Sequence, residues 1–411
     1  MCNVLYITFD GITDPLGRSQ ILPYLIGLSG RGHTIHILSQ EKQEQLTGEK
    51  ESVLKELEKH GISWDYLTYK NKPPIIQPLV QCYKIKKRAV KIIASNNINL
   101  THCRSYLAGW VGLKVQKLSG IPFLFDMRGF WADERKEGGL WPYGNPLYRA
   151  VYHRVKRLEK KLLQHADHII SLTHKGKQTI EEWGHIKDFG ESISVIPCCA
   201  DLEHFNPARY SDSDRESLRR SYSLNKEDFV LGYIGSIGTW YMLDEMLDAF
   251  AFWYKHVPNL KLFFLSKLSP GILQPKLIAR GIPVDSVRVQ STSYDHVPKH
   301  IAMFDVGLFF ILPVFSKSAS SPVKQGEMLA MGLPVLCNSG VGDTDRVIQE
   351  IGKDFLVDEF NEGAYKKALR VLRDKAYCKN LAPLCQATAK SWFDVNQGVE
   401  AYHSVYQRLT R

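Results

Sequence analysis

The chain lacks the features that would mark a membrane-spanning or metal-binding protein. Its longest apolar run, residues 307–315, falls far short of the about 20 residues that a transmembrane helix needs. The eight cysteines include no C-x-x-C pair, and the scattered histidines include no H-E-x-x-H motif. The N-terminus has no basic region before its first apolar stretch, so we expect no signal peptide. We therefore expect a cytoplasmic protein with reduced thiols and no metal site.

The chain also lacks a balance of charge, since it has 53 Lys and Arg residues against 43 Asp and Glu residues. The formal net charge of +10 suits an anionic partner. Three kinds of partner fit, namely a nucleic acid, a phosphorylated small molecule and an anionic membrane surface. No recognised nucleic-acid-binding module is present in the sequence, so we expect no nucleic-acid partner.

Strand-like runs alternate with helical patterns along all 411 residues, a length that favours two domains. Residues 3–9 and 34–39 have the pattern of strands around a helix at 19–31, and the alternation restarts with a strand at 229–235. Such alternation predicts a parallel sheet with helices on both faces. We predict an α/β protein of two Rossmann-like domains, with ligands at the carboxyl ends of the strands and in the cleft between the domains.

Residues 320–335 have the most informative local pattern, namely a helix start, a short helix, a glycine stop and a buried strand. Ser321 is expected to cap the helix and Pro322 to occupy its first position. Lys324 breaks a local rule, because a cation in the first turn opposes the helix dipole unless an anion binds there. Glu327 lies on the same helix face and can accept hydrogen bonds from sugar hydroxyls. The pattern predicts a site for a phosphate followed by a ribose, although an ordinary surface pair of Lys324 and Glu327 fits the same spacing.

A glycine-containing turn follows the strand at 229–235 and opens a helix. Its candidate donor-binding residues are Gly235, Ser236, Gly238 and Thr239. Glycines at such a turn let backbone amides approach a phosphate. The turn is not G-x-G-x-x-G and no acidic residue follows at the expected strand end, which disfavours a nicotinamide dinucleotide. A purely structural tight turn fits the same residues.

A similar strand-to-helix junction occurs in the N-terminal half, at Gly17, Arg18, Ser19 and Gln20. A junction of this kind can line a ligand site at the edge of the sheet. A simple capped turn is the alternative interpretation of these residues.

Charged and aromatic residues also gather after the predicted strand at 122–126. Asp126, Arg128 and Trp131 belong to this segment, and loops at the carboxyl ends of strands often carry function. Arg104 ends the preceding strand and can either reach the same site or neutralise Asp126. A surface loop held by salt bridges is the alternative.

A basic helical segment extends over residues 79–94. It contains Lys84, Lys86, Lys87, Arg88 and Lys91, with apolar residues between them. A basic amphipathic helix can lie on an anionic membrane, whereas a merely solvated basic face has the same composition.

In order and spacing, these motifs resemble the family 4 retaining glycosyltransferases, which have the GT-B fold of two Rossmann-like domains facing a central cleft. The resemblance covers essentially the whole chain. It is carried by residues 17–20, 125–131, 195–207, 232–238 and 321–327. It implies an acceptor-side domain at 1–205, a nucleotide-sugar-binding domain at 206–390 and a last helix at 391–411 that crosses back to the first domain.

The resemblance implies that a hexose-type sugar is transferred from a nucleoside diphosphate sugar with retained anomeric configuration and without a metal. A glycan or lipid-linked acceptor in cell-surface polysaccharide or glycoconjugate synthesis is expected. The implied location is cytoplasmic, with peripheral attachment to the inner face of the membrane.

The resemblance also implies roles for single residues. Glu327 would hold the donor ribose, the glycine turn would approach the diphosphate, and Gly17 would lie near the transferred sugar. Lys324, with Lys267, would neutralise the leaving diphosphate. Asp126 would hold a sugar hydroxyl or accept a proton, and with Arg128 it completes the predicted catalytic set.

Two departures from the family pattern leave other functions open. The first Glu of the family's glutamate pair falls at Ala319, and no cation follows Gly238 where relatives often have an Arg and a Lys. A nucleotide-sugar epimerase with the same fold is one alternative. A non-catalytic partner protein that binds a nucleotide sugar is the other.

Overall fold

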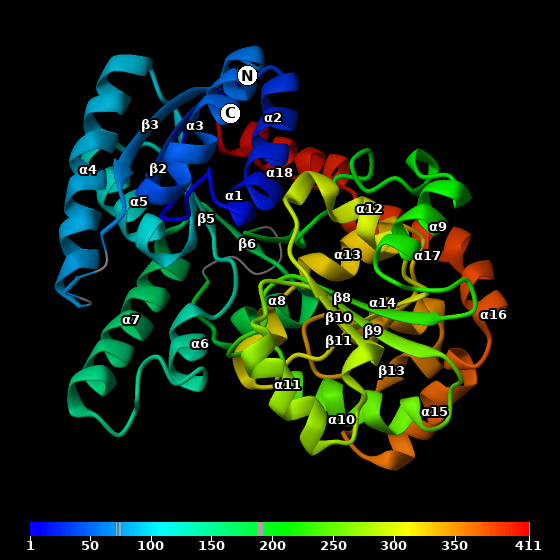
Figure 1. Cartoon of the computed structure of the whole chain (residues 1–411). Coiled ribbons are helices and arrows are strands. Elements are labelled where there is room, and N and C mark those ends of the chain that lie inside the picture. The colour runs from blue at the N-terminus through cyan, green and yellow to red at the C-terminus, as the bar shows by residue number, and fades with distance from the viewer. Residues whose placement is uncertain (71, 74, 187–191, 411) are drawn as a thin grey trace. The chain divides into compact units, whose positions relative to one another are not determined.

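A computed structural model describes the chain apart from residues 71, 74, 187–191 and 411 (Figure 1). The chain divides into two compact units. The first unit comprises residues 1–197, 315–320 and 395–411, and the second comprises residues 198–314 and 321–394.

A parallel sheet forms the centre of the first unit, with the strand order β3-β2-β1-β4-β5-β6-β7. The strands are β1 (Asn3–Ile7), β2 (Thr34–Glu41), β3 (Ser63–Thr68), β4 (Leu100–Arg104), β5 (Phe123–Asp126), β6 (His168–Ser171) and β7 (Ile193–Val195). The helices are α1 (Pro15–Gln20), α2 (Leu22–Gly30), α3 (Gln43–Lys59), α4 (Ile76–Asn96), α5 (Ser105–Ser119), α6 (Trp131–Glu137), α7 (Pro146–His165), α8 (His174–Glu182), the short 3-10 helix η4 (Phe315–Ala319) and α18 (Val395–Leu409).

Alternation along β1 decides which helices cover which face of this sheet, because successive side chains of a strand point to opposite sides. Leu5 belongs to the buried cluster that contains Ile85 of α4. The ring of Tyr6 instead packs edge-on against His102, whose ring packs beside Tyr402 of α18. Helices α4 and α5 therefore cover one face, and α18 covers the other beside α2 (Figure 1).

The second unit has its own parallel sheet, with the strand order β10-β9-β8-β11-β12-β13. The strands are β8 (Phe229–Ile234), β9 (Leu260–Leu265), β10 (Val287–Gln290), β11 (Val306–Phe309), β12 (Val335–Asn338) and β13 (Leu356–Val357). The α-helices are α9 (Asp212–Ser221), α10 (Leu243–Tyr254), α11 (Pro270–Ala279), α12 (Val297–Ile301), α13 (Val323–Ala330), α14 (Thr344–Ile351), α15 (Glu362–Leu372), α16 (Lys375–Asn380) and α17 (Ala382–Phe393). The predicted α/β class with two Rossmann-like parts is confirmed.

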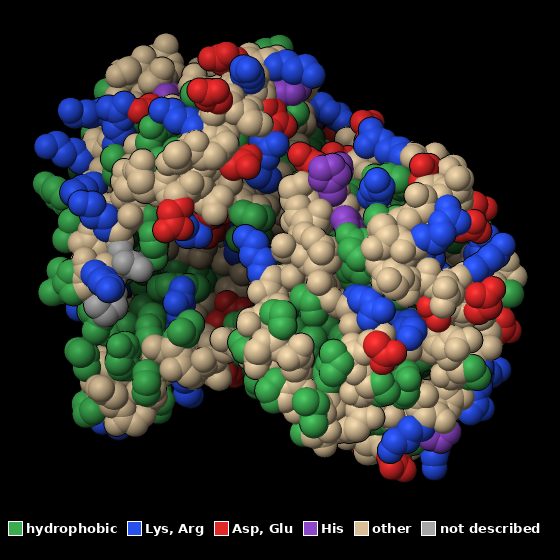
Figure 2. Space-filling view, viewed as in Figure 1, with side chains coloured by type: hydrophobic (Ala, Val, Ile, Leu, Met, Phe, Trp, Pro, Cys, Tyr) green, Lys and Arg blue, Asp and Glu red, His purple; other side chains and the backbone are tan. Residues whose placement is uncertain are grey.

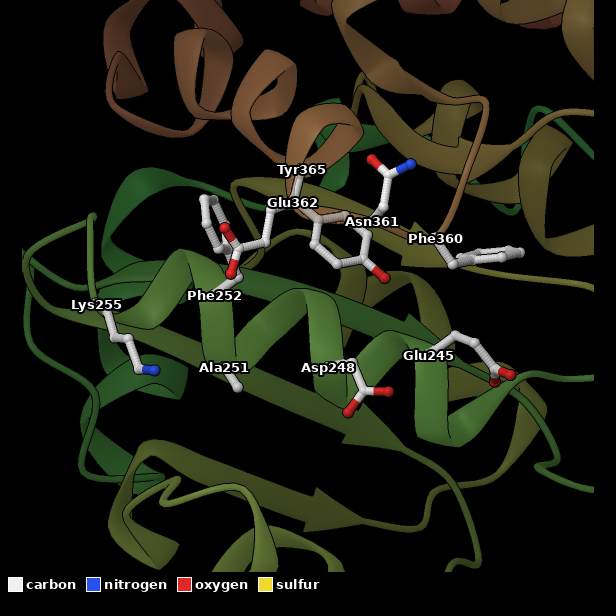
Figure 3. A pocket seen from close by; sticks show the side chains of 9 residues that line it. All are labelled: Glu245, Asp248, Ala251, Phe252, Lys255, Phe360, Asn361, Glu362 and Tyr365. Carbon is white, nitrogen blue, oxygen red and sulfur yellow. The ribbon is translucent and has the colours of Figure 1, made fainter.

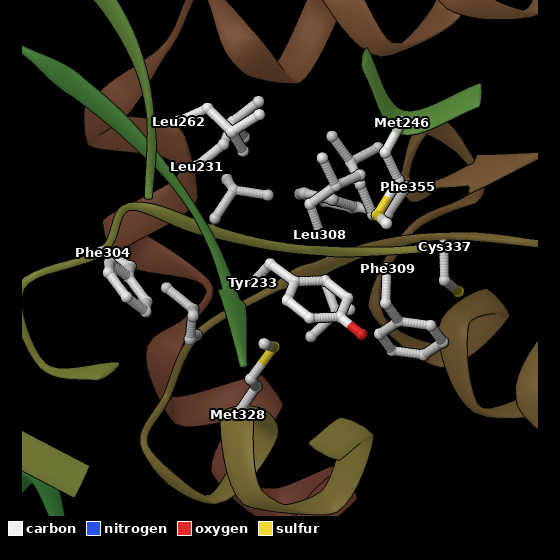
Figure 4. Packing of buried hydrophobic residues seen from close by; sticks show 14 of the residues in the cluster. Leu231, Tyr233, Met246, Leu262, Phe304, Leu308, Phe309, Met328, Cys337 and Phe355 are labelled. Atoms are coloured by element: carbon white, nitrogen blue, oxygen red, sulfur yellow. The ribbon is translucent and has the colours of Figure 1, made fainter. Parts of the chain in front are cut away.

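Helix α13 is fixed in the core of the second unit. Met328 packs among buried strand residues (Figure 4), and a Cβ on Gly307 of β11 would lie 2.4 Å from its sulfur. Gly307 thus lets the helix approach the strand backbone closely. On the other side of α13, a Cβ on Gly326 would lie 2.9 Å from the ring of Phe393. These contacts hold α13 rigidly, including its first turn.

Two local predictions were wrong. The helix expected at 19–31 is divided into α1 and α2 at Ile21, because Pro15 starts the first helix and Pro23 lies in the first turn of the second. The segment after β5, expected to be a loop, forms α6 from Trp131 to Glu137, with acids in its first turn and Arg135 and Lys136 in its last. Among the described residues, no helix is both long and apolar enough to cross a membrane.

Candidate functional site

Helix α13 begins one residue later than the sequence predicts. Pro322 is its N-cap, Val323 is its first residue, and no described side chain caps it. The Ser321 hydroxyl instead accepts a hydrogen bond from the Cys198 amide at 3.1 Å. The Gln325 amide donates to the Pro322 carbonyl oxygen at 3.0 Å, so the uncapped amides of Val323 and Lys324 are the ones that can meet an anion.

Lys324 is the second residue of α13, and its amine is buried between two aromatic rings. The Nζ atom lies 3.9 Å from the ring centroid of Tyr233 and 3.7 Å from that of Tyr241. No described residue forms a hydrogen bond with this amine. Burial lowers the pKa of Lys324 well below its usual range, and the nearby Glu327 opposes this shift only in part.

Glu327 lies one turn further along α13 and is 8% exposed. Burial raises the pKa of its carboxyl to about 7, against the opposing effect of Lys324. Lys324 and Glu327 are both buried, and no salt bridge joins them in the described structure. They are therefore not the ordinary exposed pair that the spacing alone allowed.

The glycine turn lies directly beside the Lys324 amine. A Cβ on Gly235 would lie 3.5 Å from Nζ, and Gly235 has a φ of +100°, which favours glycine. The other predicted donor residues of the turn, Ser236, Gly238 and Thr239, are exposed. Lys267 is also exposed, and the pairing of Ile234 with Leu265 places it beyond the same sheet edge. The structure thus brings the turn and α13 together.

In the first unit, Asp126 lies at the end of β5 in a buried charged cluster. Its Oδ2 accepts a hydrogen bond from the Tyr402 hydroxyl at 3.1 Å and lies 3.7 Å from Nη1 of Arg104. Its Oδ1 lies 3.8 Å from Nη1 of Arg128. Burial alone would raise the pKa of Asp126, but Arg128, His102 and Arg104 together hold it below its usual value. Such a carboxylate keeps its charge at neutral pH and is a weak proton acceptor.

The backbone after β5 adopts a conformation that few side chains tolerate. Arg128 has a φ of +58° and Gly129 a φ of +105°. This turn aims the Arg128 guanidinium back at Asp126. Trp131 then starts α6 and packs beside Tyr106 and Trp141, so it is part of the packed surface of that helix.

The N-terminal junction is built on close backbone packing. A Cβ on Gly17 would lie 2.1 Å from the Gly11 carbonyl oxygen, so α1 can rest on the preceding loop only with glycine there. Arg18 pairs with Glu56 of α3 at 2.6 Å, Ser19 is half-buried, and Gln20 is buried.

Sequence reasoning missed Glu41, a fully buried carboxylate at the end of β2. It accepts hydrogen bonds from the Ile12 amide at 2.9 Å, from the Thr13 amide at 3.2 Å and from the Thr13 hydroxyl at 2.6 Å. Ser39 also donates to it. The carboxylate thus fixes the loop on which Gly17 packs. An acid that ends an apolar strand is the only signal that the sequence offers.

Ala319, which stands where the family has its first glutamate, is buried at the end of the 3-10 helix η4. A Cβ on Gly176 would lie 3.0 Å from its methyl group, and one on Gly129 would lie 3.5 Å from its carbonyl oxygen. The alanine is therefore closely packed within the first unit, and its site offers no carboxylate.

The basic helix predicted at 79–94 is part of α4, and it belongs to a larger basic face. Helix α5 packs between α4 and α7. Together these three helices carry thirteen Lys and Arg residues and one acid, Glu159, a formal net charge of +12 compared with +10 for the whole chain. On α4, Arg88 forms a salt bridge with Asp65. No described salt bridge involves the four lysines of this helix, which are Lys84, Lys86, Lys87 and Lys91.

Exposed apolar side chains accompany these cations. Ile76, Leu79 and Tyr83 near the start of α4 are 59%, 62% and 59% exposed, and Leu147 near the start of α7 is 56% exposed. Over α4, basic and hydrophobic side chains alternate on the surface (Figure 2). Sequence reasoning found the charge of α4 but missed that of α7, although its cations are plain in the sequence.

A separate pocket of about 530 Å³ lies in the second unit between α10 and α15 (Figure 3). Glu245, Asp248 and Glu362 give it an acidic wall, and Phe252 and Tyr365 give it an aromatic one. None of the predicted donor residues lines it, and its acidic wall would repel a diphosphate.

The chain is similar in sequence to known glycosyltransferases. Residues 24–204 match the model of Glycosyltransferase Family 4. The chain is 20% identical over 312 residues to the alpha-monoglucosyldiacylglycerol synthase of Acholeplasma laidlawii, a match that covers 74% of each protein.

Solved structures share the whole fold. The Anabaena protein Alr3699/HepE in complex with UDP has a TM-score of 0.70 and 16% identity, covering 99% of this chain and 100% of that one. The sucrose-phosphate synthase of Thermosynechococcus elongatus has a TM-score of 0.71 and 15% identity, covering 99% of each chain. Both likenesses concern the fold.

Proposed function

Because the chain is a family 4 glycosyltransferase with the GT-B fold, we propose that it transfers a hexose-type sugar from a nucleoside diphosphate sugar, with retention and without a metal. The observation that carries this proposal is the buried Lys324 amine beside the exposed glycine turn. A solved protein of the same fold is described in complex with UDP, which supports a nucleotide-sugar donor.

The proposed chemistry is stabilisation of the leaving diphosphate. Negative charge grows on the diphosphate as the glycosidic bond breaks, and preorganised donors lower the energy of that state most effectively. Lys324, the amides of residues 236–238 and the first turn of α13 would supply such donors in the second unit, whereas the Gly235 amide already donates to the Leu265 carbonyl oxygen at 3.0 Å. Glu327 would hold the ribose hydroxyls, and Lys267 would add a solvated charge at the same sheet edge.

In the first unit, we assign the acceptor side to the charged cluster at the ends of β4 and β5. Arg104 and Arg128 flank Asp126, which keeps a negative charge there for binding a sugar hydroxyl. Trp131 and the junction at 17–20 would contribute further acceptor contacts. Asp126→Asn tests the cluster, since the lost charge should weaken acceptor binding more than donor binding.

We further propose a lipid-linked acceptor and peripheral attachment to the inner face of an anionic membrane. The basic face of α4, α5 and α7 supports this, since its net charge of +12 exceeds that of the whole chain. The curated relative is named for a glucosylated diacylglycerol, which is a lipid. Exposed apolar side chains near the starts of α4 and α7 suit insertion between lipid headgroups.

The decisive experiment is thermal unfolding of the purified protein with a panel of UDP-, GDP-, ADP- and dTDP-sugars. One donor is expected to raise the unfolding midpoint, and Glu327→Ala should abolish the rise. The matched control is Glu51→Ala, which removes an exposed acid of α3.

A folded protein that no nucleotide sugar stabilises would contradict the donor site. Isomerisation of the donor without any acceptor would instead identify an epimerase. Donor binding without turnover over a broad set of glycan and lipid acceptors would indicate a partner protein.

A further inference from the structure

The environment of the Lys324 amine differs from that of an ordinary phosphate-binding lysine, which is exposed or paired with an acid. The residue is 6% exposed, and its Nζ atom lies within 4 Å of the centroids of both Tyr233 and Tyr241. In the described structure the amine forms no hydrogen bond, and no carboxylate forms a salt bridge with it. The two rings thus take the place of an anionic partner.

Both tyrosines form hydrogen bonds with the glycine turn that they flank. The Tyr233 hydroxyl donates a hydrogen bond to the Ser236 carbonyl oxygen at 2.6 Å. The Tyr241 amide donates to the Gly238 carbonyl oxygen at 2.8 Å, and Tyr241 forms an antiparallel bridge with Ile311. The turn, the rings and the amine therefore form one connected arrangement.

The charged form of this amine is costly in the absence of a ligand. Burial removes water from the ammonium, and the faces of the two rings offset only part of that cost. The pKa of Lys324 is accordingly well below its usual range. The titratable groups around it are Tyr233, Tyr241 and Glu327, and burial raises the pKa of Tyr241 to about 12, so the phenol remains neutral.

We propose that Tyr233 and Tyr241 are positioning residues that hold the Lys324 amine unpaired beside the glycine turn, so that the donor diphosphate becomes its first anionic partner and the amine takes up a proton from solvent as the donor binds. This inference rests on the proposed function, because it concerns the same donor site. In the step itself, a neutral amine and a solvent proton become an ammonium paired with the diphosphate.

The consequence is specific to this chain. Tyr241 lies in the segment after Gly238, where relatives often place cations, so an aromatic ring against the buried amine occupies this segment in place of a cation. Before the donor arrives, the exposed Lys267 carries a positive charge at this sheet edge, and solvent screens it.

The test is isothermal titration calorimetry with UDP-, GDP-, ADP- and dTDP-glucose in two buffers that differ in heat of ionisation. Nucleotide sugars are the right probes, because free nucleoside diphosphates have a terminal phosphate that itself titrates near pH 6. At about pH 8.5, where a carboxyl with a pKa about 7 is ionised, the wild type should take up protons as the donor binds, because burial lowers the pKa of the free Lys324 amine well below its usual range.

Four variants separate the groups involved. Lys324→Arg keeps a permanent charge, so donor binding should proceed with almost no proton uptake. Tyr241→Phe keeps the ring and should retain the uptake, whereas Tyr241→Leu admits water to the amine and should reduce it by more than half. Glu327→Gln removes the other titratable group and should leave the uptake in place. Unfolding midpoints near that of the wild type show that each variant is folded.

Equal binding enthalpies in the two buffers, for a donor that does bind, would overturn the proton uptake and leave the donor site standing. Uptake that persists in Lys324→Arg would also overturn it. The absence of binding by all four nucleotide sugars would overturn the donor site, and this inference with it.

Discussion

At the level of single residues, Lys324 should have the largest effect on turnover, because its amine is the buried one beside the glycine turn. We expect Lys324→Ala to lower kcat by on the order of 10²–10³-fold, the usual loss when one preorganised contact to a developing charge is removed. Steady-state kinetics with the donor selected by thermal unfolding provide the measurement.

Lys267→Ala is the matched control for this prediction. Lys267 is a cation beyond the same sheet edge, but it is exposed, so solvent and salt screen its charge. Its loss should lower kcat by less than about tenfold. Equal losses in the two variants would contradict the assignment of Lys324.

The buried carboxyl of Glu327 should make folding less favourable above neutral pH. Its pKa of about 7 in the folded protein exceeds the ordinary value of 4.5, so the folded state retains a proton that the unfolded chain has released. The free energy of unfolding should therefore fall as pH rises between those values, by about 3 kcal/mol in total.

Glu327→Gln cannot ionise, so it should raise the unfolding midpoint at about pH 8 and change it little at about pH 4. The same variant should bind the donor more weakly. Thermal unfolding of both proteins at the two pH values is the measurement, with Glu51→Gln as the exposed control. A difference that does not depend on pH would refute the prediction.

At the level of elements, the loop between β1 and α1 depends on the buried Glu41 carboxylate. Glu41→Gln replaces one acceptor oxygen with an N–H group that faces existing donors, and it should cost about 3 kcal/mol of unfolding free energy. Urea unfolding measures this loss. Glu56→Gln, which breaks the partly exposed pair with Arg18, should cost less than about 1 kcal/mol.

The sequence predicted the helices that begin with local signals and misplaced those that depend on tertiary contacts. Helix α7 begins with such signals, because Asn145 caps it and Pro146 occupies its first position. Ser321 was expected to cap α13 by the same logic, but its hydroxyl bonds to the Cys198 amide, which is distant in sequence. A tertiary partner of that kind cannot be read from local pattern.

The same limit applies to the candidate site. Lys324 and Glu327 could be placed on one helix from spacing alone, and their burial was not foreseen. The two rings against the Lys324 amine could not be predicted either, because Tyr233 and Tyr241 meet a lysine more than eighty positions further along the chain. The packing of α13 against β11, β12 and α17 brings them together.

At the level of the whole molecule, charge is distributed far from evenly. The +12 on α4, α5 and α7 means that the remainder of the chain has a formal net charge of −2. This sum could have been made from the sequence, but the packing of α5 between α4 and α7 was needed to show that the cations belong to one helical layer.

That layer makes membrane attachment testable by flotation with liposomes. A triple variant with Arg154, Arg157 and Lys161 changed to Gln removes three exposed cations of α7. At about 1 kcal/mol for each cation near an anionic surface, it should weaken partitioning to vesicles rich in phosphatidylglycerol on the order of 100-fold at low salt.

The matched control changes Lys226, Lys367 and Arg370 of the second unit to Gln. These side chains are 81%, 62% and 81% exposed, so the control loses the same charge from solvated positions outside the three helices. It should partition like the wild type. If both triple variants lose binding equally, attraction depends on net charge alone, and the helical layer is not the attachment surface. If the wild type does not float at low salt, a soluble acceptor is favoured, because a membrane-borne acceptor requires the enzyme to reach the lipid surface.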